Sequence, residues 1–322
     1  MTGNSHALNT LPIGQSVQQQ GDKCCIDLGE GRITVSKESG GYWRVSENTL
    51  TGSEYVKALV LLLEQRKDIR CIELNENSAS ALEDIVQVSA EGIKLVWRES
   101  LLQLPEFWLL QQRRLMPHKQ ILASNGYHPL RPRAQKGELY RRYIPELEQT
   151  LSLVGLNVEE HAELFSKWQN SQRVAAFWEQ TGTLEEHRAY LEEQLVNDKN
   201  QLLIVCLNNE PFAYIEAYWT KEDRIAPYYS AGDYDRGIHM LVGKEHHRGS
   251  HKVAAWLPSI CHFLYLSDPR TGKIISEPRA DNAKMIGYLK QYGFAKLKEF
   301  DFPHKRAALM CQLRDTFFSD CY

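Results

Sequence analysis

The sequence lacks a long apolar run, a large net charge and any regular spacing of cysteines. Its longest apolar segment, ALVLLLEQ, meets a charge at Glu64, well short of the roughly 20 residues that a membrane-spanning helix needs. The first 23 residues also lack the basic start and the apolar core of a secretory signal. These absences predict a cytoplasmic protein with no membrane partner.

Charge and cysteine content exclude further classes. There are 38 lysine and arginine residues against 41 aspartate and glutamate residues, so the net charge is only −3 and nucleic acid is not expected as a partner. The seven cysteines include one close pair, Cys24 and Cys25, which has the spacing of neither a zinc knuckle nor a disulfide framework. The composition is therefore that of an ordinary globular protein.

Length and composition indicate two domains. The 322 residues are about twice the roughly 150 residues of a typical domain. Residues 116–143 contain three prolines, two glycines and many basic residues between more apolar neighbours, which is typical of a crossing between domains. We place the boundary near Pro145, which gives an α+β domain of unknown role at 1–145, with a flexible leader, and a second domain at 146–322.

Alternation and helical periodicity predict the elements of both domains. In the first domain we expect strands at 23–29, 32–37, 42–47, 69–74 and 93–98 and a helix at 53–67. In the second we expect strands at 150–156, 201–207, 211–219, 237–243, 272–278, 294–302 and 305–313. Its helices are expected at 157–170, 171–180, 183–198, 250–266 and 282–292, the first of them capped by Asn157.

The segment at 233–251, DYDRGIHMLVGKEHHRGSH, concentrates residues that bind metals or phosphates. A metal is not expected, because His246 and His247 are adjacent and point in different directions, and no carboxylate or thiolate follows at helical spacing. A phosphate fits better, since a strand ends at Gly243 and residues 248–251 begin a helix whose free N–H groups and dipole attract anions. On these residues alone, a turn glycine beside a solvated arginine explains the segment equally well.

A family resemblance bears on this choice. The segment RGSH after GIHMLVG, followed by SEPRADNAKMIGYLKQYGF, resembles the acyl-coenzyme A binding signature of the GNAT acyltransferase superfamily. FWEQTG, YWTKEDRIAPYYSAGDYDRGIHMLVG, DPRTGKIISEPRADN and EFDFPHKRAAL are similar to its siderophore-biosynthesis branch, the N6-hydroxylysine acetyltransferases of aerobactin assembly. The resemblance spans residues 140–318. It implies an α/β (α+β) fold of the GNAT type, a mixed and mostly antiparallel sheet flanked by helices, after a smaller α+β N-terminal domain.

The resemblance also implies where an acyl donor binds. The donor would be acetyl-CoA or succinyl-CoA, with no metal involved. Its pyrophosphate would lie against Arg248, Gly249, Ser250 and His251, and Asn282 would begin the helix beside the pantetheine arm. A backbone amide of Met240 or Leu241 would donate to the oxyanion. This chain departs from the family pattern at His246, His251 and Leu289, the last of which lies where many members have a tyrosine that protonates the leaving thiolate.

Two residues are the candidates for catalysis. His239 lies on the strand before the glycine turn, and a neutral imidazole there could accept the proton of an attacking hydroxyamine. From the residues alone, a buried histidine paired with a carboxylate is the simpler interpretation, whereas the resemblance implies a catalytic base. Glu277 matches an acidic residue that works beside that histidine. Asp281 is expected to be the N-cap of the following helix.

The substrate site is the least determined. The charged and aromatic side chains that complement a cationic substrate, with or without a carboxylate, are Trp178, Tyr228, Tyr229, Asp235, Arg236 and Arg279. The resemblance implies an N-acyltransferase that converts an N-hydroxylated amine, first N6-hydroxylysine with acetyl-CoA, to a hydroxamate. N-hydroxyputrescine or N-hydroxycadaverine with an acetyl or succinyl donor, and a non-catalytic acyl-CoA-binding module, are the alternatives. The hydroxylase and synthetase enzymes of the same pathway are the expected partners.

Overall fold

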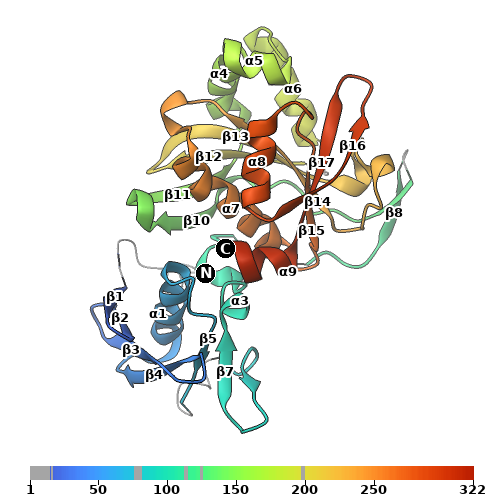
Figure 1. Ribbon diagram of the computed structural model, residues 1–322. Helices are drawn as coiled ribbons and strands as arrows, with labels where there is room; N and C mark the ends of the chain where they lie inside the picture. The colour runs from blue at the N-terminus through green and yellow to red at the C-terminus, as the bar shows by residue number, and fades with distance from the viewer. Residues whose placement is uncertain (1–14, 16, 76–81, 112–114, 124–125, 197–199) are drawn as a thin grey trace, which may run out of the picture. The chain divides into compact units, whose positions relative to one another are not determined.

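The computed structural model describes residues 15, 17–75, 82–111, 115–123, 126–196 and 200–322, which form two compact units (Figure 1). The first unit comprises the chain up to Leu110 together with Tyr143–Gln149 and Tyr322, and the second comprises Gln111–Arg142 and Thr150–Cys321. Pro145, the expected boundary, lies in the short segment that the first unit takes from the middle of the chain.

The first unit is a mixed sheet with one long helix. Its seven strands lie in the order β1-β2-β3-β4-β5-β7-β6, and only β4 and β5 are parallel. The elements are β1 (Gln18–Gln20), β2 (Lys23–Asp27), β3 (Arg32–Lys37), β4 (Trp43–Asn48), α1 (Gly52–Gln65), β5 (Cys71–Glu73), β6 (Gln87–Val88), β7 (Lys94–Trp97), α3 (Arg98–Leu101) and η3 (Pro105–Phe107). The helix and five strands expected from the sequence are all confirmed.

The second unit is built on an eight-stranded sheet in the order β10-β11-β12-β13-β14-β15-β17-β16. Its strands are β10 (Gly137–Ile144), β11 (Gln149–Gly155), β12 (Asn200–Leu207), β13 (Glu210–Trp219), β14 (Arg236–Val242), β15 (Lys273–Ser276), β16 (Phe294–Asp301) and β17 (Arg306–Leu313). From β11 to β16, β14 and β15 are parallel and the other neighbouring strands are antiparallel. This arrangement confirms the expected mixed and mostly antiparallel sheet.

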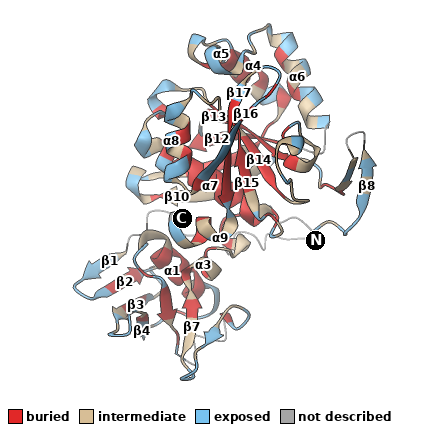
Figure 2. Ribbon diagram, turned by 45° about the vertical axis from the view of Figure 1, so that its right-hand side comes forward, coloured by how far each residue is buried: buried red, intermediate tan, exposed pale blue. Residues whose placement is uncertain are grey.

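Helices flank this sheet. They are α4 (Val158–Gln169), α5 (Gln172–Trp178), α6 (Leu184–Val196), η5 (Thr220–Glu222), η6 (Ala226–Tyr228), η7 (Glu245–His247), α7 (Ser250–Ser267), α8 (Ala283–Gln291), α9 (Arg314–Thr316) and η8 (Phe317–Cys321). The short η4 (Pro145–Leu147) belongs to the first unit. Phe165 and Trp168 of α4 pack with Ile204 of β12, Tyr214 of β13 and Leu241 of β14. Figure 2 shows the central strands and α7 largely buried. The five predicted helices of this domain are confirmed.

The segment 116–143 is more ordered than the sequence indicates. It contains a two-stranded sheet, β8 (Gln120–Ala123) with β9 (Gly126–Pro129), and the end strand β10. The sequence analysis did not predict these strands, because their segment is rich in proline and basic residues. Such residues are common on edge strands, where a charged side chain reaches water and discourages pairing with another chain.

The sheet opens between β14 and β15. The parallel pairing covers only Arg236 with Ile274 and Gly237 with Ile275, whereas β13 follows β14 as far as Val242. The backbone of β14 beyond Gly237 is therefore free of a strand partner on its β15 side, within the residues that the structure describes.

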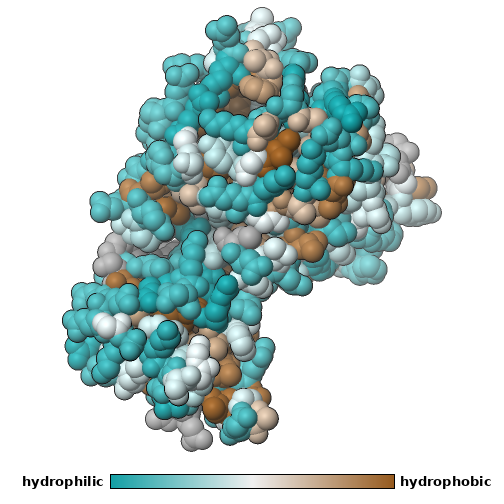
Figure 3. Space-filling view, in the orientation of Figure 1, coloured by the Kyte–Doolittle hydropathy of each residue, from teal (hydrophilic) through white to brown (hydrophobic). Residues whose placement is uncertain are grey.

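One face of the molecule can be inspected for apolar patches. Figure 3 shows a mostly hydrophilic face with small and separate apolar patches. Within the described ranges, none of the helices combines the length and the apolar character needed to span a bilayer.

The close approach of Gly243 to Trp168 gives a test of the packing. A Cβ atom at Gly243 would lie 2.1 Å from the buried indole ring, whereas one at Gly272 would meet nothing within 4 Å. We expect Gly243→Ala to lower the free energy of unfolding by about 1–3 kcal/mol, as overpacking of a core does. Urea denaturation measures it. Gly272→Ala is the matched control, and an equal effect of the two substitutions would contradict this account.

Candidate active site

Three adjacent strands bring a histidine and two glutamates into one row. In the antiparallel register of β13 and β14, Glu216 lies opposite His239. In the parallel register of β14 and β15, Gly237 pairs with Ile275, so two residues further on Glu277 lies beside His239. Because side chains alternate along a strand, all three side chains project from one face of the sheet.

Both nitrogens of the His239 ring are bound. Nδ1 lies 2.9 Å from Oε2 of Glu216, and Nε2 lies 2.5 Å from Oε1 of Glu277. The Glu277 side chain is fully buried, whereas 22% of the His239 side chain remains exposed. Solvent and ligands therefore reach the imidazole rather than the Glu277 carboxylate.

Tyrosine hydroxyls donate further hydrogen bonds to both carboxylates. Tyr190 of α6 and Tyr214 donate to Oε1 of Glu216 at 2.5 and 3.0 Å. Tyr218 donates to Oε2 of Glu277 at 2.8 Å. These charge-assisted hydrogen bonds offset the loss of water around each carboxylate.

The imidazole and the carboxylates stabilise each other's charged forms. Burial alone would lower the pKa of His239, but the Glu277 and Glu216 carboxylates outweigh it and raise this pKa to about 10. Burial likewise opposes ionisation of Glu277, yet His239 lowers the pKa of this carboxyl to about 2. The neutral imidazole assumed in the sequence analysis is therefore not the form that the two carboxylates favour.

The sign of each shift fixes the pH range of its stabilising effect. The raised pKa of His239 contributes stability that is complete below its ordinary value of 6.5 and is lost as the pH rises towards about 10. The lowered pKa of Glu277 contributes stability that is present above 4.5 and is lost as the pH falls towards about 2. Both contributions are complete only between these two ordinary pKa values.

The row forms the floor of a pocket of about 470 Å³. The other lining residues described here fall into aromatic side chains (Phe177, Trp178, Tyr190, Tyr218), cationic or imidazole side chains (Arg224, Arg279, His304, Lys305), acids (Glu179, Asp223) and amides (Gln180, Gln194, Asn200, Asn282). The Trp178 ring stands edge-on to His239 with centroids 6.5 Å apart. A pocket of this size and polarity suits a small polar molecule with charges of both signs.

Six of the residues predicted for the site line this pocket. They are Trp178, His239, Met240, Glu277, Arg279 and Asn282. The side chain of Asn282 accepts from the N–H of Met285 at 3.2 Å and is the N-cap of α8. The expectation that Asp281 is this cap is wrong, because Asp281 instead pairs with Arg279 at 2.7 Å.

Four other predicted substrate residues have partners away from the pocket lining. Asp235 is buried and accepts from Gly232 N–H and from the Tyr229 hydroxyl. Arg236 is buried with its guanidinium 4.0 Å from the centroid of the Trp219 ring. Tyr228 packs on Phe300 and Phe302. These residues bind one another and the core, so we do not include them in the proposed substrate site.

The backbone distinguishes Met240 from Leu241. The N–H of Gly243 donates to the carbonyl of Phe212 in β13 at 2.8 Å. Because successive N–H groups of a strand point to opposite sides, the amide of Leu241 also faces β13 and that of Met240 faces the opening beside β15. Leu241 is in the core, whereas Met240 lines the pocket.

The turn before α7 has the features of an anion site. Gly249 is the N-cap with φ of 115°, in the region that favours glycine. Within the described part of the chain, the N–H groups of Gly249, Ser250 and His251 donate to no acceptor. Arg248 is exposed and, after burial, is the second cause of the lowered pKa of Arg173 on α5, which indicates two neighbouring guanidiniums.

The sequence analysis missed Glu216, Tyr190, Arg224 and Lys305. Glu216 had a signal: it is the only charged residue within PFAYIEAYW, a strand that is otherwise apolar or aromatic. A buried carboxylate in such a strand requires a partner. Tyr190, on α6, and Lys305, before β17, reach the site through tertiary packing, which no local pattern indicates.

Comparisons with known proteins agree with this geometry. Residues 157–302 match the model of the acetyltransferase (GNAT) domain family. Over 228 residues, 70% of this chain and 72% of the relative, the chain is 40% identical to the N(6)-hydroxylysine O-acetyltransferase of Escherichia coli. It is 42% identical over 196 residues to a hydroxyornithine transacylase of Ajellomyces capsulatus, of which it covers 44%. The crystal structure of an uncharacterized Bacillus halodurans protein superposes with a TM-score of 0.55 and 28% identity, over 58% of this chain and 97% of that one.

The split sheet, the pocket beside it and the glycine turn are thus those of an acyltransferase of the GNAT class. The chain belongs to the GNAT acyltransferase family that includes the N(6)-hydroxylysine O-acetyltransferase of Escherichia coli.

The charge of His239 can be measured directly. We expect its ring to stay protonated up to a pH of about 10, because two carboxylates hold the proton. Titration of the ring nitrogens by NMR, with the signals assigned by their loss in His239→Ala, measures this pKa. Glu216→Gln and Glu277→Gln should each lower it. A midpoint close to 6.5 in the unmodified protein would refute the paired geometry.

Proposed function

We propose that the protein transfers the acyl group of an acyl-CoA to the hydroxylated side-chain nitrogen of an amino acid, giving the hydroxamate of a siderophore. The placement of His239 between Glu216 and Glu277 in a pocket is the observation that carries the proposal. The names of the relatives, a hydroxylysine acetyltransferase and a hydroxyornithine transacylase, support the class of acceptor.

The glycine turn fits the pyrophosphate of the donor. Free N–H groups at Gly249, Ser250 and His251 lie at the first turn of an 18-residue helix, whose dipole favours anions. A side chain at Gly249 would fill space beside this turn, since its Cβ would lie 3.1 Å from the His251 ring. Arg248 and Arg173 add positive charge. When bound, the donor supplies a thioester, an acyl group activated for attack by nitrogen.

The site residues accept the proton that the attacking nitrogen loses. In the reaction an N–C bond forms and a C–S bond breaks, so the proton of the nitrogen must leave and the thiolate must gain one. With both carboxylates ionised and His239 protonated, the row has a net charge of −1 and can accept one proton. Substrate that replaces one hydrogen bond of His239 frees an acceptor at the pocket floor. A thiolate with an ordinary pKa of about 8.5 then needs little help to leave.

The amide of Met240 has a second role. It faces the opening between β14 and β15 and lies next to His239 in the sequence. We assign it the donation of a hydrogen bond to the carbonyl oxygen of the acyl group, on which negative charge develops during attack.

The pocket lining has charges of both signs, which suits an amino acid. The acidic row attracts a cationic or neutral hydroxyamine, whereas Arg224 and Lys305 provide positive charge for a carboxylate. The Phe302 ring positions both, since the Arg224 guanidinium carbon and Lys305 Nζ lie 5.3 and 5.6 Å from its centroid. Burial lowers the pKa of Lys305, as expected for an ammonium without a full set of anionic partners. N6-hydroxylysine with acetyl-CoA is our first choice. A succinyl donor would require a further cation; Arg279 lines the pocket, and its guanidinium would have to exchange its pairing with Asp281 for the succinyl carboxylate.

Turnover tests the reaction. We expect N6-hydroxylysine and acetyl-CoA to release coenzyme A and give a hydroxamate detected by mass spectrometry. His239→Ala should lower kcat by about 10² or more, the usual contribution of a general acid or base. The dissociation constant of coenzyme A should be the same for the His239→Ala protein as for the unmodified protein.

Gly249→Val is the contrasting control, because it should weaken coenzyme A binding while leaving the acidic row unchanged. His239→Gln keeps a polar side chain of similar reach and excludes unfolding as the cause. If the protein binds coenzyme A but turns over none of the hydroxyamines, the proposed activity is contradicted and the protein is a non-catalytic acyl-CoA-binding module.

The carboxylate site is tested by two substrates that differ in one group. Lys305→Met should raise the KM for N6-hydroxylysine about 10-fold or more, since a hydrogen bond to a charged group is lost. The KM for N-hydroxycadaverine, which has no carboxylate, should not change. Because Lys305 Nζ also donates to the Glu277 carbonyl at 2.8 Å, a purely structural role would impair both substrates alike.

A further inference from the structure

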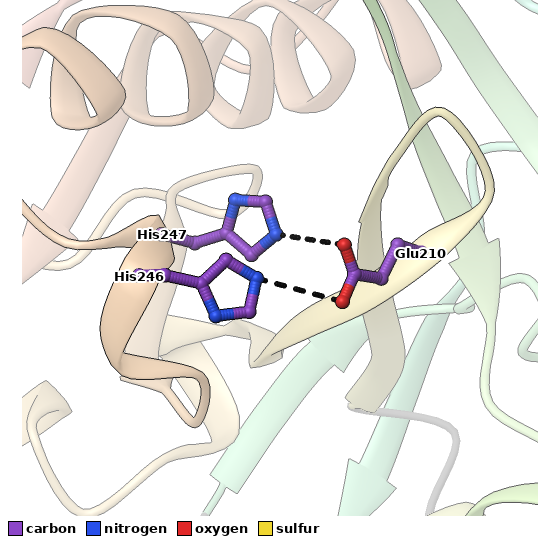
Figure 4. Close-up of side chains that lie close together, drawn as sticks. All are labelled: Glu210, His246 and His247. Carbon is purple, nitrogen blue, oxygen red and sulfur yellow. Dashed lines mark hydrogen bonds and ion pairs between the residues drawn. The ribbon is translucent and has the colours of Figure 1, made fainter.

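A second polar cluster lies outside the pocket, at the first residue of β13. The side chains of Glu210, His246 and His247 converge there, each offering one ligand atom within 4.8 Å of the others (Figure 4). Glu210 begins β13, directly after the turn from β12, and the two histidines come from η7. The trio contains residues that neither the proposed reaction nor the pyrophosphate site uses.

The structure contradicts the reason for expecting no metal in this segment. The two adjacent histidines were expected to point in different directions, but both present Nε2 to the Glu210 carboxylate, from which they lie 3.5 and 3.2 Å (Figure 4). The carboxylate was absent from the local sequence pattern because it comes from 36 residues before His246.

The distances fit a tetrahedral ion. Zinc lies about 2.0–2.1 Å from imidazole nitrogen and about 2.0–2.2 Å from carboxylate oxygen, so neighbouring ligand atoms of a tetrahedron are about 3.3–3.4 Å apart. The two contacts from nitrogen to oxygen are close to this length, 3.5 Å from His246 Nε2 to Oε1 and 3.2 Å from His247 Nε2 to Oε2, so the carboxylate presents one oxygen to each ring. The ligand atoms of the two rings lie within 4.8 Å of each other, and rotation of the exposed His246 ring can bring them closer.

One histidine is already fixed. The His247 ring is buried and packs on Phe212 with centroids 4.8 Å apart. The Nε2 atom faces the trio, and within the described residues Nδ1 has no partner.

A lysine contacts the same carboxylate. Lys244 Nζ donates to Oε1 of Glu210. An ammonium ion uses only the carboxylate of the trio. A divalent ion binds the carboxylate and both imidazoles, so it competes with an advantage of one charge and two ligands.

We propose that Glu210, His246 and His247 bind a divalent transition-metal ion of the zinc class, with water as the fourth ligand and with displacement of Lys244. The bound ion joins η7, which directly precedes Arg248, to the start of β13. It thereby fixes the segment from which the glycine turn begins. This inference does not depend on the acyl-transfer reaction.

Binding of zinc to the tag-free protein tests the site. Isothermal titration with ZnCl₂ should give one ion per chain with a Kd of about 10 µM or below. CoCl₂ should give the visible absorption of a tetrahedral complex. His246→Ala, His247→Ala and Glu210→Gln should each weaken binding at least 10-fold, by analogy with the effect of losing a supporting ligand. Lys244→Met removes the competing ammonium and should strengthen binding.

A matched control separates this site from adventitious binding. His118 is exposed and lies far from the trio in sequence, so His118→Ala should leave the Kd unchanged. Circular dichroism verifies that Glu210→Gln, a change at a partly exposed carboxylate, remains folded. The proposal is overturned if the Kd exceeds about 100 µM or if a folded Glu210→Gln protein binds zinc as tightly as the unmodified protein.

Discussion

A protonated imidazole held between two buried carboxylates is the interaction on which the second unit depends. An isolated charge of either sign would be costly in this interior, whereas His239, Glu216 and Glu277 stabilise each other and receive three tyrosine hydroxyls in addition. Removal of His239 leaves the two carboxylates without the imidazolium between them. The strand order β13-β14-β15 is what brings together residues 61 positions apart in the chain, and so the site is inseparable from the sheet.

The same strand connects the pocket to the glycine turn. His239 and Met240 lie at the pocket, and the carbonyls of Val242 and Gly243, further along β14, accept from Arg173 at 2.6 and 3.2 Å. Arg173 is on α5, the helix that also ends at the pocket residue Trp178. One strand and one helix therefore set the spacing between the reacting group and the phosphate-binding end of a donor.

The sequence predicts more of the fold than of the candidate site. Most strands and helices follow from local periodicity, and His239 and Glu277 lie on strands whose order a known family supplies. Glu216 required the register of β13 against β14, and Lys305 required the tertiary packing of the loop before β17. Asp235 and Arg236 resemble ligand residues in the sequence, yet each is buried with partners of its own. The difference is physical, since a pattern indicates which face a residue occupies but not which distant groups satisfy it.

The protonation state is the property least visible in the sequence and the most consequential for chemistry. A histidine at its ordinary pKa would already be a neutral base, open to water, in the absence of substrate. Here both ring nitrogens are bound and the ring is charged, so the imidazolium can donate but not accept, and the proton acceptor is a carboxylate that a ligand frees by taking its place at the ring. A hydroxyamine can do so because it both donates and accepts hydrogen bonds, and the net negative row favours its approach. Substrate binding and activation of the base are consequently one event, which protects a thioester in the pocket from attack by water.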